Sequence, residues 1–246
     1  MRKSYRELTE EIKTDGERLK LIAALGSSDD LAYHYALICE DWAAGGKLLL
    51  ENSFDRHGEA GIVFLLERLR ALGTASKTDE SATAGTATDT AYLAAKILSQ
   101  LRHRDFYAAR AKELAALLTA RWEIRDIALR RKQIIALGWI GSESEINFLI
   151  DSMQSDSDAL CRAWAAAALM QLSFHGVAAD VLRERTKTAF AEVIQKEGDL
   201  NAAGIMIEAA QTLFGKKWIS AAAAEAAESE SIEKARKSAL RFLGKA

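Results

Sequence analysis

Trp122 and Asp126 come closest, among the residues of this chain, to a site whose types and spacing could do chemistry. They stand four positions apart in the run Arg121-Trp122-Glu123-Ile124-Arg125-Asp126, so a helix would place both side chains on one face. Residues 100–133 around them hold seven Arg and two Lys against four acidic residues, a net charge of +5, which suits phosphate groups. The structural interpretation of the same pair makes Trp122 a packing residue and Asp126 a helix cap or a partner of an adjoining unit.

The other reactive residue types form no recognisable site in the sequence. Four histidines are scattered, and none stands at metal-ligand spacing from a carboxylate or a second histidine: His34, His57, His103 and His175. Cys39 and Cys161 are 122 positions apart, each within an apolar helical pattern, which predicts buried free thiols. The sequence has no Gly-x-Ser-x-Gly, no dinucleotide-binding glycine pattern and no Cys-x-x-Cys. We therefore expect no metal, no cofactor and no catalytic residue.

Arg130 and Arg162 introduce the same spacing of apolar residues twice, 32 positions apart. After each arginine, small or apolar residues follow at +4, +6, +7, +8 and +10, which is the spacing of one helical face. Between the two copies, residues 143–153 show the pattern of a complete second helix. A period of about 30 residues that holds two helices is typical of a stacked repeat array.

This pattern resembles HEAT-like repeats, in particular the short repeats of phycobilisome-lyase-type proteins. The resemblance is carried by Arg130 to Gly141 and by Asp156-Ser157-Asp158, where either aspartate could be the N-cap of the following helix. It covers residues 125–175 best and residues 1–26 and 199–246 less closely. It implies an all-α fold, an α-solenoid of five or six stacked antiparallel helix pairs in a single domain over residues 1–246, with irregular helices within residues 30–70.

The chain has no proline, although average usage of roughly 5% would give about a dozen, so no position forces a helix to break. The phrase Ala-Leu-Gly recurs at residues 24–26, 71–73 and 136–138, with degraded copies at 213–215 and 242–244. We expect each glycine to close a helix in the left-handed conformation. Residues 74–90 lack large apolar side chains and are rich in Thr and Ser, which predicts a flexible loop between helices.

The arginines at repeated positions admit two interpretations. An arginine at a fixed place in a repeat can bridge to carboxylates or carbonyls of the adjoining unit, and this favoured role applies to Arg130 or Arg131, Arg162 and Arg236. The alternative is contact with a ligand. Among the tryptophans, Trp139 stands at a helix end where its ring could project toward a partner. We expect the others to lie partly in the core: Trp42, Trp164 and Trp218.

Composition and charge favour a recognition protein of the cytoplasm. The net charge of −2 gives no general attraction to nucleic acid or membranes, and no stretch approaches 18 uninterrupted apolar residues. The predicted function is non-catalytic recognition of another macromolecule, most often a protein, on the concave wall made by the second helices of the pairs. Scaffold, regulator, assembly factor and inhibitor, such as a toxin-neutralising protein, all fit this description. The candidate binding residues are Arg121, Trp122, Arg125, Asp126, Arg130, Arg131, Trp139 and Arg162.

An alternative function follows from a second resemblance. HEAT-like DNA glycosylases that excise alkylated purines have a similar spacing from Trp to Asp, with an arginine about one repeat later that would correspond to Arg162. This resemblance implies that Trp122 would stack on the damaged base and Asp126 would stabilise positive charge developing on the sugar. Nucleic acid would then bind the basic segment 100–133. The chain shows no match for the further aromatic residue of such sites. The phycobilisome-lyase resemblance alone suggests a third role, in attaching a tetrapyrrole to a protein.

Overall fold

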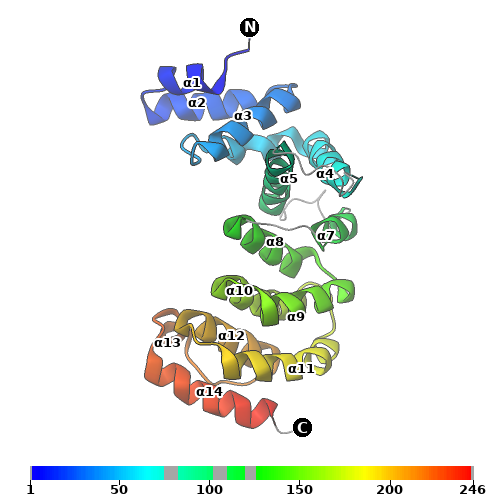
Figure 1. Cartoon of the computed structure of the whole chain (residues 1–246), viewed down its shortest axis with the longest axis vertical. Helices are drawn as coiled ribbons and strands as arrows, with labels where there is room; N and C mark the ends of the chain where they lie inside the picture. Colours follow the sequence, from blue (N-terminus) through cyan, green and yellow to red (C-terminus); the bar gives the residue numbers. More distant parts are fainter. Residues whose placement is uncertain (1, 75–82, 102–109, 120–125, 245–246) are drawn as a thin grey trace. The chain divides into compact units, whose positions relative to one another are not determined.

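The computed structural model describes residues 2–74, 83–101, 110–119 and 126–244 of the chain. These residues form α-helices and short 3-10 helices, and no β-strand occurs among them, which confirms the all-α prediction. The chain divides into two compact units, residues 1–106 and 107–246 (Figure 1). The expectation of a single domain over residues 1–246 stays a prediction.

The first unit is built around a 3-10 helix with three buried residues, Leu50, Ser53 and Phe54. Its elements are α1 (Tyr5–Glu11), α2 (Asp15–Gly26), α3 (Leu31–Ala43), η1 (Leu50–His57), α4 (Gly58–Thr74) and α5 (Thr83–Gln100). The 3-10 helix η1 contacts α2, α3 and α4, and α4 packs along α5. The expectation of irregular helices within residues 30–70 is therefore correct. Asp41, buried on α3, fixes the start of η1 by accepting hydrogen bonds from the N–H groups of Leu48 and Leu50 and from the hydroxyl of Tyr5.

The predicted loop at residues 74–90 is wrong in its second half. Helix α5 begins at Thr83, so residues 83–90 form its first turns. Absence of large apolar residues does not prevent a helix, because alanine has the highest helix propensity and no proline interrupts the segment. The apolar residues 91–98 then anchor the same helix in the core of the unit. Residues 75–82 lie outside the described residues.

The second unit is a stack of helix pairs in two layers. Its elements are α7 (Ala111–Thr119), α8 (Ile127–Ile140), η2 (Glu143–Glu145), α9 (Ile146–Ser155), α10 (Ala159–Leu172), α11 (Ala179–Lys196), α12 (Leu200–Leu213), α13 (Ala221–Glu225) and α14 (Ser229–Leu243). Helices α8, α10 and α12 pack side by side in one layer, while α9 and α11 pack together in the other (Figure 1). Helix α14 packs on both α11 and α12, and the short α13 packs on α12.

Three helices of the first layer share a start signal and a burial pattern. Asp126, Asp158 and Asp199 are the N-caps of α8, α10 and α12, and each side chain accepts from the backbone N–H three residues later. Counted from the cap, the residues at +3, +7, +8, +10 and +11 are buried in all three helices. The 32-residue repeat seen in the sequence is thus confirmed, and α12 adds a third copy 41 positions further on.

The glycines of the repeated phrase serve two different purposes. Gly138 lies inside α8 rather than after it, and a Cβ atom there would come within 2.9 Å of Cα of Ala168 on α10. Gly26 is also a close-approach residue, since its Cβ would lie 2.9 Å from the backbone oxygen of Ser53. Among Gly26, Gly138 and Gly215, only Gly215 adopts the predicted left-handed conformation after a helix, with φ of 64°. The left-handed conformation is therefore wrong at Gly26, the last residue of α2, and at Gly138, inside α8; at both positions close packing leaves no room for a side chain.

Candidate functional site

The repeated arginines connect neighbouring helix pairs. Arg130 on α8 holds Asp156 before α10 with two hydrogen bonds of 3.0 Å, from Nε and from one terminal nitrogen. Its neighbour Arg131 donates to Asp158, the N-cap of α10, at 3.0 to 3.1 Å. These bonds tie the first layer to the loop that begins the next helix.

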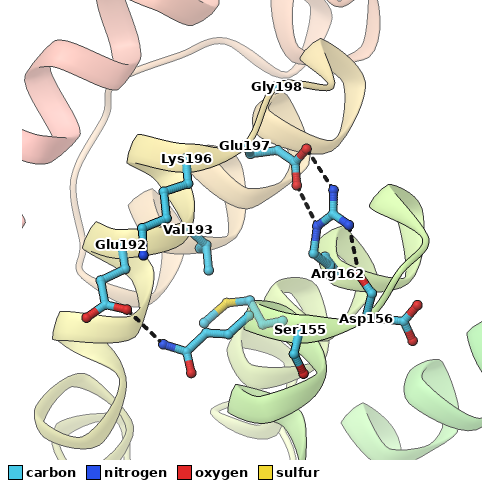
Figure 2. A pocket seen from close by; sticks show the side chains of 10 residues that line it. Ser155, Asp156, Arg162, Glu192, Val193, Lys196, Glu197 and Gly198 are labelled. Carbon is cyan, nitrogen blue, oxygen red and sulfur yellow. Dashed lines mark hydrogen bonds and ion pairs between the residues drawn. The ribbon is translucent and has the colours of Figure 1, made fainter.

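Arg162 on α10 makes the corresponding connection one repeat later (Figure 2). Its Nε and one terminal nitrogen donate to the two carboxylate oxygens of Glu197 at 2.8 and 2.9 Å, and its other terminal nitrogen donates to the backbone oxygen of Asp156 at 2.8 Å. The side chain of Glu197 is only 4% exposed and that of Arg162 is 23% exposed, so this is a two-point ion pair with a buried carboxylate and a partly exposed guanidinium.

Asp156 and Glu197 occupy equivalent places in successive repeats. Each stands two residues before an N-cap aspartate and accepts a hydrogen bond from the backbone N–H of that aspartate, at 2.9 and 3.0 Å. Burial by itself raises the pKa of Glu197, but the hydrogen bonds from Arg162 and the Asp199 N–H outweigh it and hold the pKa below its ordinary value. The hydrogen bonds that Arg130 donates to Asp156 raise the pKa of Arg130. Glu197 and Arg130 are therefore charged near neutral pH.

Arg236 on α14 closes the series by a different route. One terminal nitrogen donates to the backbone oxygen of Ile194 at 2.6 Å, and the other donates to that of Glu197 at 2.9 Å. It thereby satisfies carbonyls at the end of α11, which a helix terminus otherwise leaves without partners. The sequence favours a bridging role for the repeated arginines, and the structure shows this role at Arg130, Arg131, Arg162 and Arg236.

Of the predicted Trp122–Asp126 pair, only Asp126 lies among the described residues. Asp126 is the N-cap of α8, and its carboxylate accepts from the Leu129 N–H at 2.9 Å, which is one of its two structural roles proposed from the sequence. Arg121, Trp122 and Arg125 lie outside the described residues. A joint site of Trp122 and Asp126 stays a prediction.

A cavity of about 420 Å³ lies beside the Arg162–Glu197 pair, where the ends of α9 and α11 meet (Figure 2). Its wall combines charges of both signs with the backbone of a turn: Met153, Gln154, Ser155, Asp156, Arg162, Glu192, Val193, Lys196, Glu197 and Gly198. The amide of Gln154 donates to Glu192 across it at 3.1 Å. The ion pair thus forms one side of the cavity while holding α10 to the loop before α12.

The outward side of α8, α10 and α12 carries a second feature, made of apolar rather than charged residues. At +2, +6, +9 and +13 from the three N-cap aspartates, all side chains are at least partly exposed. We call these twelve residues the α8–α10–α12 face: Ala128, Lys132, Ile135, Trp139, Leu160, Trp164, Ala167, Gln171, Asn201, Ile205, Glu208 and Thr212. Its centre is apolar, and its only charged members are Lys132 on α8 and Glu208 on α12.

The tryptophans on this face correct one prediction and refine another. Trp164 was expected partly in the core, but it is 37% exposed because position +6 from the cap points away from the other layer. Trp139 is partly buried, and its ring lies 4.6 Å from the His175 ring, beside the exposed Phe174. Sequence reasoning missed Ile135, Leu160 and Ile205. The aspartates at equivalent helix starts would have identified these positions as parts of one exposed face.

Other reactive groups remain structural within the described residues. Cys161 is buried and Cys39 half-buried, both are free thiols, and burial raises the pKa of both, that of Cys161 to about 11. In the parts of the chain that the structure describes, no three His, Cys, Asp or Glu side chains gather as metal ligands would. None of the described helices combines the length and the apolar composition needed to cross a membrane.

Comparison with known proteins agrees with this architecture. The family model of HEAT repeats matches residues 80–170. These residues include the ion pairs of Arg130 with Asp156 and of Arg131 with Asp158, and most of α10. No curated protein and no solved structure matches the chain significantly. The match over residues 80–170, the two-helix units, the N-cap aspartates in register and the arginines that bridge successive pairs are all consistent with a HEAT-like repeat protein.

Proposed function

We propose that this protein recognises another protein through the α8–α10–α12 face, without carrying out a chemical reaction. The observation that carries the proposal is the set of at least partly exposed apolar side chains that three successive helices contribute to this face: Ile135 on α8, Leu160 and Trp164 on α10, and Ile205 on α12. Stacked repeats present such extended surfaces, and HEAT repeats generally mediate protein interactions.

The charges of the second unit support a protein rather than a nucleic acid as partner. Arg130, Arg131 and Arg162 donate to carboxylates of their own chain, so these guanidinium groups already have anionic partners. Lys132 and Glu208 stand on opposite helices of the face, and neither makes an ion pair among the described residues. A complementary partner therefore offers an apolar centre, with an acidic group toward α8 and a basic group toward α12.

Ala167 provides the most direct test, because it lies in the middle of the face on α10 and is already partly exposed. Ala167→Arg places a long charged side chain in the apolar centre, where binding would have to desolvate it. We expect the affinity for a protein partner, co-purified from native extract and then isolated, to fall at least about 10-fold, equivalent to about 1.4 kcal/mol. Isothermal titration calorimetry with the full-length chain measures this change.

Ala191→Arg is the matched control, since Ala191 is equally a partly exposed alanine inside a helix, but on α11 of the other layer. It should leave the affinity unchanged. Equal losses from both substitutions, or no loss from Ala167→Arg, would argue against this face as the binding surface. Binding of nucleic acid that weakens steeply with added salt would instead support the alternative function centred on the basic segment 100–133.

A further inference from the structure

His34 of the first unit connects both ends of η1 to α3. It is fully buried, its Nε2 lies 3.0 Å from the backbone oxygen of Leu50, and its Nδ1 lies 2.8 Å from Nε2 of His57. Leu50 is the first residue of η1 and His57 is the last. One imidazole therefore holds the whole eight-residue segment against α3.

The hydrogen-bond partners of His34 determine which ring nitrogens of neutral His34 and His57 carry hydrogens. A carbonyl oxygen only accepts, so Nε2 of His34 must carry a hydrogen and donate to Leu50. Nδ1 of neutral His34 then accepts, and Nε2 of His57 donates to it. Once both nitrogens of His57 carry hydrogens, a proton added to Nδ1 of His34 would set two N–H groups against each other at 2.8 Å and would bury a charge. A proton added to Nδ1 of His57 leaves its donated bond intact, because Nε2 keeps its hydrogen.

The surroundings supply no carboxylate to compensate a charge on His34. Its ring packs against the buried Phe54, with 5.3 Å between ring centroids. Charged residues stand on η1 and on every helix packed against it: Asp15, Glu17, Arg18 and Lys20 on α2, Glu40 and Asp41 on α3, Glu51, Asp55 and Arg56 on η1, and Glu59, Glu67, Arg68 and Arg70 on α4, with Asp29 just before α3. Among the described charged groups, only His57 shifts the pKa of His34. Asp29 acts on His57 rather than on His34, and Asp41 is committed to the N–H groups of Leu48 and Leu50. Glu51 of η1 pairs with Lys96 of α5.

The backbone at both ends of η1 is suited to movement. Leu49, just before it, has φ of 55°, a conformation that a non-glycine residue adopts only at a cost, and Gly58, just after it, has φ of 58°. Eight residues also exceed the usual length of a 3-10 helix, whose hydrogen bonds are poorer than those of an α-helix. Side-chain anchors, including the bond from Ser53 to the Ile22 carbonyl, therefore hold η1 in place.

We propose that the His34–His57 pair is a proton-operated clasp, which holds η1 against α3 while His34 is neutral and releases it when His34 is protonated. Release exposes Leu50 and Phe54, both fully buried in the closed form. Burial lowers the pKa of His34 from 6.5 to about 4 and also lowers that of His57. Because the folded pKa of His34 is depressed, its contribution to closure is complete above pH 6.5 and declines as the pH falls toward 4.

Hydrogen–deuterium exchange of the full-length chain tests the clasp directly. After correction for intrinsic exchange rates, protection of residues 48–57 should fall about 40-fold between pH 6.5 and 4.5, because a single group whose pKa is about 4 in the closed form and 6.5 in the open form changes the opening equilibrium by that factor over this range. Helices α10 and α12 of the second unit should keep their protection over the same range. Unchanged protection of residues 48–57, or simultaneous loss in both units, would overturn the proposal.

Two substitutions separate the clasp from general acid sensitivity. His34→Gln keeps a donor for the Leu50 carbonyl but cannot be protonated, so the pH response should disappear. His57→Gln offers an amide oxygen that can accept from protonated His34, so the response should shrink, and this variant decides the matter if His34→Gln fails to fold. His175→Gln in the second unit is the matched control and should retain the full response. A full response in both His34→Gln and His57→Gln, or in His57→Gln alone should His34→Gln not fold, would contradict the clasp.

Discussion

Replacement of Arg162 by alanine should lower the free energy of unfolding of the second unit by about 3 kcal/mol. The reason is the carboxylate of Glu197, which is 4% exposed and would lose both of its charged donors, while the Asp156 carbonyl would lose one. Breaking a buried pair from one side costs about 3–5 kcal/mol, and the partial exposure of Arg162 favours the lower end of that range. Urea unfolding of the full-length chain, followed by circular dichroism, measures the change.

The double variant Arg162→Met with Glu197→Met is the informative control. Removing both charges avoids a stranded carboxylate, so most of the lost stability should return. Asp180→Ala, which removes one partner of the exposed pair with Arg183, should change stability by less than about 0.5 kcal/mol. If Arg162→Ala lowered the free energy of unfolding no more than Asp180→Ala does, the Arg162–Glu197 pair would not be holding the helix pairs together.

Replacement of Gly138 by leucine should destabilise the second unit by about 3 kcal/mol. Leucine favours helices more than glycine does, so local propensity alone predicts a gain. The close approach of α8 and α10 reverses the sign, because a Cβ at position 138 would lie 2.9 Å from Cα of Ala168, an atom that moves only if the helix moves. Overpacking of this kind costs about 1–3 kcal/mol, with backbone contact at the upper end. The midpoint of urea unfolding at unchanged slope reports it.

Gly16 provides the matched comparison because it lies in helix α2 with space around it. A Cβ there would meet only Oγ1 of Thr14, at 3.9 Å. Gly16→Ala should therefore leave stability unchanged or raise it by up to about 1 kcal/mol. A Gly138→Leu variant as stable as the parent protein would mean that α8 and α10 do not approach as closely as described.

The repeat architecture could be predicted because several signals agree. Apolar spacing after Arg130 and Arg162, an intervening helix and a fixed period together leave few alternatives to stacked pairs. The bridging arginines also followed, since an arginine at the same position in two successive repeats, Arg130 and Arg162, needs an acceptor at a fixed place in the next unit. The acceptors Asp156 and Glu197 were not paired with them in advance. They differ in residue type, and the second repeat is longer than the first.

The errors came from residues whose role depends on distance rather than on local conformation. A glycine after a helical pattern fits both a helix end and a tight helix crossing, and only the position of Ala168 decides between them at Gly138. Similarly, tryptophan is a residue type typical of a core, but Trp164 stands six residues after the N-cap Asp158, on the outward side of α10. The His34–His57 contact joins residues 23 positions apart through an irregular segment, so no periodicity announces it.

The most direct test of the recognition surface is site-specific photo-cross-linking in cells that make the full-length protein. A photoreactive side chain at Ile135, Ala167 or Ile205 lies on the α8–α10–α12 face, whereas one at Asp151, Glu184 or Ala191 lies on the other layer. We predict a discrete cross-linked protein partner from the three face positions and none from the other three. Cross-links to that partner only from Asp151, Glu184 or Ala191 would contradict the account.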